Sequence, residues 1–190
     1  MAGRGVRRSI LLLVSSMSAG GRSVRLGPRI VRILRSGGWE VAVRLTTPGD
    51  DPAALAGQVA ADTIVAALGG DGYLSAVARG CHESSAIFAP MPGGRGNDLC
   101  RALGIGTDPL ARARDLARLG FASAPSGNEA VAGRVRHSAD LLVKRVHPLD
   151  GMWVRSRDGV RLALGVVSVG LDARANILAN ESSLTSGPLA

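Results

Sequence analysis

The chain has 190 residues, 46% of them hydrophobic and 20% charged, so it can form at least one packed globular domain. The net charge is +8, and nearly all of the positive charges are arginines, since Lys144 is the only lysine. This balance is compatible with anionic membranes, nucleotides or nucleic acid, and also with codon bias alone. No apolar run is long enough to cross a bilayer, and no basic patch with interleaved aromatics predicts RNA binding, so we expect no nucleic-acid partner.

The cysteines and the N-terminus bear on the cellular compartment. Cys81 and Cys100 are isolated and, like the three histidines, lack metal-ligand spacing, so no metal site is expected on them. Two free thiols favour the reducing cytoplasm, where the protein can still lie peripherally on a membrane. Arginines precede the apolar run 10–14 as in a signal peptide, but such peptides need roughly 7–15 apolar residues, so a first buried strand is favoured.

Short apolar runs alternate with helical patterns in the first two thirds of the chain. Strands are predicted at 9–14, 40–46, 63–68 and 86–89, with a small-residue turn at 15–21 after the first of them. Between the strands, the predicted helices are one opened by Pro28 and closed by Gly37-Gly38, one capped by Asp51 from Pro52 to about Ala61, and one covering 74–79. After the last strand we expect a short helix from Asn97 or Asp98 to Leu103 and an amphipathic helix from Asp108-Pro109. This alternation predicts a parallel, Rossmann-like α/β sheet with right-handed crossovers.

Two glycine-rich turns follow consecutive buried strands. The first is Gly69-Gly70-Asp71-Gly72, and the second runs from Pro92 to Asp98. In a parallel sheet both turns lie at the carboxyl edge, where ligands bind. Glycine allows positive φ and a close backbone approach, so the amides of such turns can bind an anion, for which phosphate is the natural occupant.

Asp71 is the informative residue of the first turn. A carboxylate inside a phosphate-binding turn is repulsive unless a divalent cation lies between the two anions, directly or through water. Neither turn matches a P-loop, because no Lys-Ser or Lys-Thr follows.

Together the two turns resemble the catalytic domain of diacylglycerol kinases and their bacterial lipid-kinase relatives, which include sphingosine kinases. The first turn alone is also similar to NAD kinases and phosphofructokinases, whereas the second turn, about twenty residues later, is much more specific. The resemblance implies ATP-dependent phosphorylation of a lipid hydroxyl, such as that of diacylglycerol, with Mg²⁺. It therefore implies a role in lipid metabolism and phospholipid biosynthesis, with the lipid presented at a membrane surface.

The resemblance also implies the site residues. The nucleotide-binding set is Thr47 (with Thr46 as a close second), Gly69, Gly70, Asp71, Gly72, Gly93, Gly94, Arg95, Gly96 and Asn97. The metal-binding set is Asp71, which is also the catalytic candidate, and Asp140, which matches a family aspartate that helps to hold magnesium through water. In the loop after the first strand the family usually has Asn-Pro, whereas this chain has Ser16-Met17-Ser18-Ala19-Gly20.

Two residues of the second turn have open roles. The Arg95 guanidinium, where many relatives carry threonine, could bind phosphate in a forked geometry or be a solvated loop charge. Asn97 and Asp98 are candidate caps for the following helix, and in the family this asparagine also organises the nucleotide loop.

From about Phe121 the pattern changes to short strands joined by turns, including segments at 140–143 and 161–167 and the turn Arg157-Asp158-Gly159. We expect an α/β nucleotide-binding domain at 1–122 and the opening strands of a β-rich sandwich domain at 123–190.

The family usually continues for roughly a hundred residues more, and that part carries the acidic residue thought to act as general base. This chain is therefore expected to be C-terminally truncated and to show little or no phosphorylation. Asp172 is a candidate base, although capping of the next helix is the favoured role. Open strand edges invite association, and a homodimer is one form of it.

Two alternatives stay open at this point. One is an NAD kinase-like enzyme, against which the second turn argues. The other is a non-catalytic nucleotide-binding fragment. Neither the lipid acceptor nor the general base can be identified from the sequence.

Overall fold

The computed structural model describes residues 9–61, 63–121, 146–157, 159–167 and 169–181. Its elements are β1 (Ser9–Ser15), a 3₁₀ turn (Ser18–Gly21), α1 (Arg22–Ser36), β2 (Glu40–Thr46), α2 (Pro52–Gly57), β3 (Ile64–Gly69), α3 (Asp71–Ser84), β4 (Ile87–Pro92), α4 (Asp98–Ala102), α5 (Pro109–Phe121), β5 (Met152–Ser156), β6 (Gly159–Ala163) and α7 (Leu171–Glu181).

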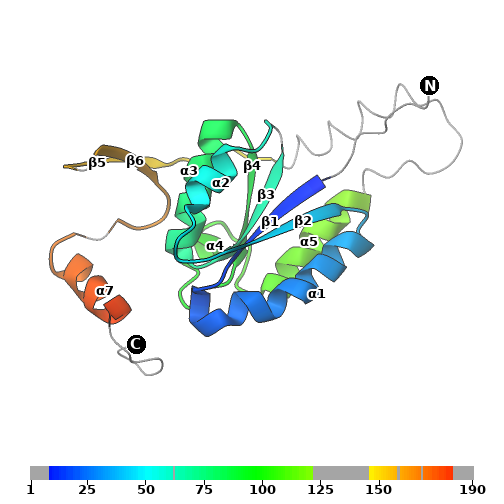
Figure 1. The fold of residues 1–190 in the computed structure, drawn as a ribbon, viewed down its shortest axis with the longest axis horizontal. Coiled ribbons are helices and arrows are strands. Elements are labelled where there is room, and N and C mark those ends of the chain that lie inside the picture. The colour runs from blue at the N-terminus through cyan, green and yellow to red at the C-terminus, as the bar shows by residue number, and fades with distance from the viewer. Residues whose placement is uncertain (1–8, 62, 122–145, 158, 168, 182–190) are drawn as a thin grey trace, which may run out of the picture.

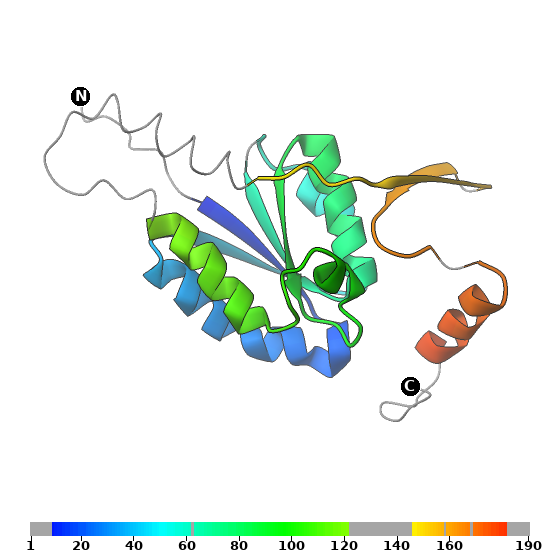
Figure 2. The same cartoon turned by 180° about the vertical axis from the view of Figure 1, so that it is seen from behind.

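The first four strands form one parallel sheet in the order β2-β1-β3-β4, which confirms the predicted α/β, Rossmann-like architecture. Helices α1 and α5 cover one face of the sheet, and α2 and α3 cover the other (Figures 1 and 2). Every residue of β3 is buried, as expected for a strand between two helical layers.

Strand side chains alternate between the two helical layers with the period of two that a pleated strand imposes. In β1, Ile10, Leu12 and Val14 join the core under α1 and α5, whereas Leu13 joins the core under α2 and α3. The uninterrupted apolar runs of β1 and β3 are therefore explained by burial on both faces.

The order of the strands creates a topological switch point between β1 and β3. From β1 the chain moves outward to β2, and then crosses to β3 on the opposite side of β1. Ligands of doubly wound sheets bind at such a point, beyond the carboxyl ends of the strands. The Ser15 end of β1 and the Gly69 end of β3 flank it.

Helix α1 begins earlier than the sequence predicts. The expectation that Pro28 opens the helix is wrong, because α1 starts at Arg22 and holds Pro28 in its interior. Proline lacks the N–H that would bond the carbonyl of Val24, four residues earlier. Val24 is exposed, so water can satisfy that carbonyl. The predicted end is confirmed, since Gly37 closes the helix and Gly38 has a φ of 83°.

Other boundaries differ by a few residues. The Asp51 carboxylate caps α2 as predicted, accepting a bond of 2.9 Å from the Ala53 N–H. However, α2 ends at Gly57 and not near Ala61, because glycine has a low helix propensity. Strand β4 continues through Pro92, where the sequence predicts an end at residue 89; among the described strands β4 is an edge strand, and edge strands tolerate proline.

Beyond α5 the described chain forms an antiparallel hairpin of β5 and β6, as the sequence predicts, but the strand predicted at 161–167 ends at Ala163. The Ser75 hydroxyl of α3 accepts a bond of 2.9 Å from the Leu164 N–H, so the end of the hairpin is attached to the first domain. The segment at 140–143 lies outside the described residues, and the division into 1–122 and 123–190 stays a prediction. In the part of the chain that is described, no helix combines the length and apolarity needed to cross a membrane.

Gly80 on α3 should be needed for the packing of α2 on α3. A Cβ added there would clash with the Ala53 carbonyl oxygen and come within 2.8 Å of the Ala56 Cβ. We expect Gly80→Ala to lower the free energy of unfolding by about 1–3 kcal/mol, the usual cost of overpacking. Gly49→Ala in the loop after β2 is the control, because a Cβ there would meet nothing within 4 Å and should stabilise by about 0.4–1 kcal/mol. Urea unfolding measures both changes, and equal effects would contradict the packing argument.

Candidate functional site

The two glycine turns are in direct backbone contact. The Gly69 carbonyl accepts a bond of 2.8 Å from the Gly93 N–H, which extends the pairing of β3 with β4 into the turns. A Cβ on Gly94 would lie 2.6 Å from the Gly70 Cα, and a Cβ on Gly93 would lie 2.8 Å from the Gly69 nitrogen. Only glycine at Gly93 and Gly94 allows this approach, so the turns form one unit.

The glycines of the two turns are not needed for positive φ. The sequence predicts positive φ in these turns, but no glycine of either turn has it. The glycines concerned are Gly69, Gly70, Gly72, Gly93, Gly94 and Gly96. The close approach that glycine permits here is, at Gly93 and Gly94, an approach of one turn to the other.

Asp71 joins the two turns through its side chain. It is the first residue of α3, and its Oδ1 accepts a bond of 2.9 Å from the backbone N–H of Leu99 in the first turn of α4. Asp71 therefore caps a helix that begins 27 residues later in the chain. An acidic group near two helix N-termini is stabilising, because both helix dipoles favour negative charge there.

The other carboxylate oxygen of Asp71 faces the second turn. The Oδ2 atoms of Asp71 and Asp98 each lie 3.2 Å from the position that a Cβ on Gly96 would take. Glycine at this position leaves the space between the two carboxylates open. Asp98 is itself paired with Arg101, at 2.8 Å, on the exposed side of α4.

Asn97 organises the second turn and does not cap α4 with its side chain. Its Oδ1 accepts a bond of 2.9 Å from the Gly94 N–H, and its Nδ2 donates one of 3.0 Å to the Gly94 carbonyl. Asn97 is buried and has a φ of 57°, a left-handed conformation that asparagine tolerates better than most residues. Of the two predicted roles, the organisation of the loop is the one observed.

The backbone amides at the site divide into bonded and open groups. The Gly70 N–H donates to the Ser18 hydroxyl at 3.1 Å, and the Gly94 N–H is held by Asn97. The first bond inside α3 runs from the Leu74 N–H to the Gly70 carbonyl, so the amides of the three preceding residues point out of the helix end. Within the described residues these amides have no acceptor, which makes them the donors available to an anion.

A cleft of about 420 Å³ opens at the switch point beside these amides. Its lining comes from the ends of β1, β2 and β3 and from the start of α3. The lining residues are Ser15, Met17, Ser18, Thr46, Thr47, Pro48, Asp50, Pro52, Gly70, Asp71, Gly72, Tyr73 and Ala76.

The loop after β2 is held by Asp50. Both the N–H and the hydroxyl of Thr47 donate to Asp50 Oδ2 at 2.8 Å, and Arg44 binds Oδ1 at 2.9 Å. These bonds, led by that from the Thr47 N–H, lower the pKa of Asp50 to about 2. The Thr47 hydroxyl proton is thus used inside the loop, and its oxygen can still accept. Thr46 is buried, with its hydroxyl 3.2 Å from both the Val14 carbonyl and the Tyr73 hydroxyl.

Comparison with known proteins identifies this arrangement. The family model of the diacylglycerol kinase catalytic domain matches residues 9–125, which include both glycine turns and the cleft. The chain belongs to the diacylglycerol kinase catalytic domain family. The match spans the second turn as well as the first, and so favours the lipid-kinase interpretation over an NAD kinase-like one.

One curated relative and several solved structures are similar to this chain. A probable lipid kinase YegS-like protein of Pseudomonas aeruginosa (strain UCBPP-PA14) is 36% identical over 133 residues, which cover 66% of this chain and 41% of that protein. A diacylglycerol kinase of Bacillus anthracis strain Sterne, 23% identical, matches over 60% of this chain and 41% of its own with a TM-score of 0.50. A putative diacylglycerol kinase of that strain, 22% identical, matches over 60% of this chain and 42% of its own with a TM-score of 0.53. These structures show the shared fold, and the chain spans about two fifths of each relative.

The predicted roles of three further residues have different outcomes. Arg95 is exposed on the second turn, and its contact with phosphate stays a prediction. Asp140 lies outside the described residues, so its pairing with Asp71 is also a prediction. Asp172 is the second residue of α7 and not its cap, which corrects the capping role expected for it. Within the residues described, no group of three or more His, Cys, Asp or Glu side chains could hold a metal ion.

Three residues of the site were missed from the sequence. The Thr47-Pro48-Gly49-Asp50 pattern could have indicated Asp50, because aspartate often bonds the backbone of its own turn. Ser18, which binds the Gly70 N–H, had no such signal, since its partner is 52 residues away. Tyr73 packs against Gly69 and lines the cleft, and no local pattern predicts that contact.

The bond from Leu99 to Asp71 predicts a difference between two substitutions. Asp71→Ala removes the acceptor and should cost about 0.5–2 kcal/mol in free energy of unfolding, as for other lost caps. Asp71→Asn keeps an oxygen at the same place and should cost less, mainly the helix-dipole contribution of about 0.3–1 kcal/mol. Urea unfolding compares them, with Asp115→Ala on the exposed side of α5 as control. An equal loss in both Asp71 variants would show that the charge, and not the bond, stabilises the junction.

Proposed function

We propose that this protein is an ATP-dependent lipid kinase that transfers the γ-phosphate to a lipid hydroxyl, such as that of diacylglycerol, with Mg²⁺. The observation that carries the proposal is Asp71, a carboxylate at the junction of two packed glycine turns in a chain of the diacylglycerol kinase catalytic domain family. The junction lies at the carboxyl edge of a parallel sheet, where this class of fold binds ligands.

The cleft fits a nucleotide with its phosphates at α3. The open amides of Asp71, Gly72 and Tyr73 at the start of α3 can bind phosphate oxygens. Gly72 has nothing within 4 Å of its would-be Cβ, so a ligand can approach its backbone. The base and ribose would then occupy the space toward the loop after β2, where Thr47 can accept a hydrogen bond.

The donor set also fits a divalent cation. Asp71 uses Oδ1 for the protein and keeps Oδ2 free beside the open space at Gly96, with Asp98 opposite. Carboxylate oxygens together with phosphate and water are the usual surroundings of Mg²⁺ in proteins. When bound, the ion would neutralise phosphate charge, and Asp140 is the second residue proposed to hold it.

Given this arrangement, the protein's own contribution is positioning. Phosphoryl transfer depends on the alignment of donor and acceptor and on electrostatic stabilisation. The contact between the turns and the Asp71 bond to α4 hold the amides and the carboxylate in fixed relation, so little reorganisation is needed on binding.

Calorimetry with ATP and Mg²⁺ tests this proposal. The protein should bind ATP with an affinity that rises when Mg²⁺ is present. Asp71→Asn should weaken the Mg²⁺-dependent part by about 10–100-fold, the usual effect of losing a partner that holds a metal through water. Asp115→Asn removes the same charge on α5 and should bind normally. An absence of heat at millimolar ATP, from folded protein, would contradict the proposal.

The acceptor is proposed to be reached at an anionic membrane surface. Helix α1 carries exposed arginines at helical spacing on one side and contains no acidic residue. They are Arg22, Arg25, Arg29, Arg32 and Arg35. The opposite side, with Ile30 and Leu34, packs on the sheet. A basic stripe of this kind attracts anionic lipid headgroups.

Vesicle co-sedimentation tests the basic stripe. Arg29→Gln with Arg32→Gln should weaken binding to phosphatidylglycerol vesicles by about 1 kcal/mol per arginine at low salt. Arg114→Gln with Arg118→Gln on α5 is the control with equal charge loss. High salt should abolish the difference, because it screens surface charges. If both double variants bind alike, the α1 stripe is not the docking face.

A further inference from the structure

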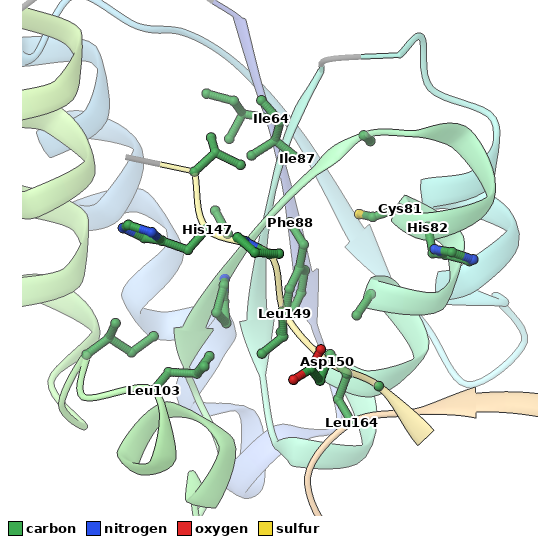
Figure 3. A pocket seen from close by; sticks show the side chains of 18 of the residues that line it. Ile64, Cys81, His82, Ile87, Phe88, Leu103, His147, Leu149, Asp150 and Leu164 are labelled. Carbon is green, nitrogen blue, oxygen red and sulfur yellow. The ribbon is translucent and has the colours of Figure 1, made fainter. Parts of the chain in front are cut away.

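A second cavity, of about 830 Å³, lies away from the nucleotide cleft and shares no lining residue with it. Its floor is β4, and its walls are α3 on one side and α4 with α5 on the other. Figure 3 shows the segment 146–151 crossing it, with Phe88 and Leu149 near its centre and Cys81 and His82 on the α3 side. The lining is dominated by aliphatic and aromatic side chains.

The cavity extends along the sheet. It runs beside β4 from Ile87 to Pro90, a distance of about 10–13 Å at the rise of a strand. Ile64 and Ile87 line one end, while Leu103 and Leu164 line the other (Figure 3). An apolar cavity of this length can hold a short hydrocarbon chain.

One end of the cavity is close to Asp71. The Leu164 N–H is bonded to Ser75, one helical turn after Asp71 on α3. Leu103 follows the last residue of α4, a helix that begins beside Asp71. These short helical segments place that end roughly 6–10 Å along α3 or α4 from the carboxylate. A chain in the cavity can therefore extend from a headgroup at the glycine turns.

Arg112 adds a polar group to the wall. Its Nε donates to the Pro90 carbonyl at 3.2 Å, and burial lowers the pKa of its guanidinium. The nearby carboxylate of Asp115 binds Arg118 instead, at 3.0 Å. Within the described residues the other N–H groups of Arg112 have no acceptor, so they can bind an oxygen such as an ester carbonyl.

We propose that this cavity binds an acyl chain of the lipid acceptor, with the ester carbonyl at Arg112. The proposal rests on the proposed lipid-kinase function and names where its substrate lies. The apolar lining of the cavity, its extent along β4, its nearness to Asp71 and the Arg112 guanidinium agree with such an occupant.

Trp153 provides a direct reporter. It lines the cavity with 63% of its surface exposed and stacks edge-on against His82 at 5.8 Å. The other tryptophan, Trp39, is buried and donates to the Leu116 carbonyl. Dioctanoylglycerol brominated at its chain ends, used below its micelle concentration, should quench tryptophan fluorescence saturably. Trp153→Phe should remove most of the quenching.

Matched substitutions separate the cavity from the surface. Leu149→Asp puts a charge in the cavity and should weaken binding of the probe at least tenfold. Val160→Asp lies on the hairpin outside the cavity and should change binding of the probe less than twofold. Leu149 is 43% exposed and Val160 is 52% exposed, so both variants should fold. Leu103→Trp fills the cavity without charge and replaces Leu149→Asp if that variant unfolds. Arg112→Met should weaken binding of the probe several-fold, whereas Arg118→Met should leave it unchanged.

Calorimetry with ATP and Mg²⁺ on the same proteins distinguishes the two proposals. Normal nucleotide binding with no saturable quenching, or equal quenching in Leu149→Asp and Val160→Asp, would overturn the acyl-chain site and leave the kinase proposal standing. Quenching that follows the expected order, without nucleotide binding, would support a lipid site and overturn the kinase.

Discussion

The contact between the two glycine turns is the constraint on which the rest of the site depends. Gly93 bonds to Gly69, and Gly94 packs against Gly70 so closely that a side chain at Gly93 or Gly94 would not fit. This contact brings the start of α4 beside the start of α3, which lets Asp71 cap α4. The open amides of α3, the free oxygen of Asp71 and the cleft at the switch point are consequences of this one arrangement.

The site and the core are also connected through α3 and α4. Helix α3 begins at Asp71, packs on α2 through Gly80, and contacts the end of the hairpin at Ser75. Cys100 of α4 is buried, and burial with the nearby Asp71 charge raises the pKa of its thiol to about 11. Helices α3 and α4 therefore contribute to both the candidate nucleotide site and the apolar cavity.

Much of the fold could be predicted from the sequence, because strand burial and helix caps leave local patterns. Asp51 with Pro52 indicated α2, and the apolar runs indicated β1 and β3. The start of α1 was missed because Pro28 is tolerated inside this helix, where the carbonyl that loses its helical partner belongs to the exposed residue Val24. The glycine turns indicated the candidate site, but the bond from Leu99 to Asp71 joins segments distant in the chain, and no local pattern predicts it.

The contact between the turns also affects how this motif should be interpreted in other sequences. At Gly93 and Gly94 glycine is demanded by the neighbouring backbone, whatever the ligand. A protein that had lost catalysis would still need both glycines to fold, so their retention is evidence of architecture. Divergence of function should appear first at positions such as Gly72, which lines the cleft and where no neighbouring group would meet a Cβ. Glycines that hold two loops together thus report on the shared fold, whereas a glycine that only faces the cleft reports on what the cleft binds.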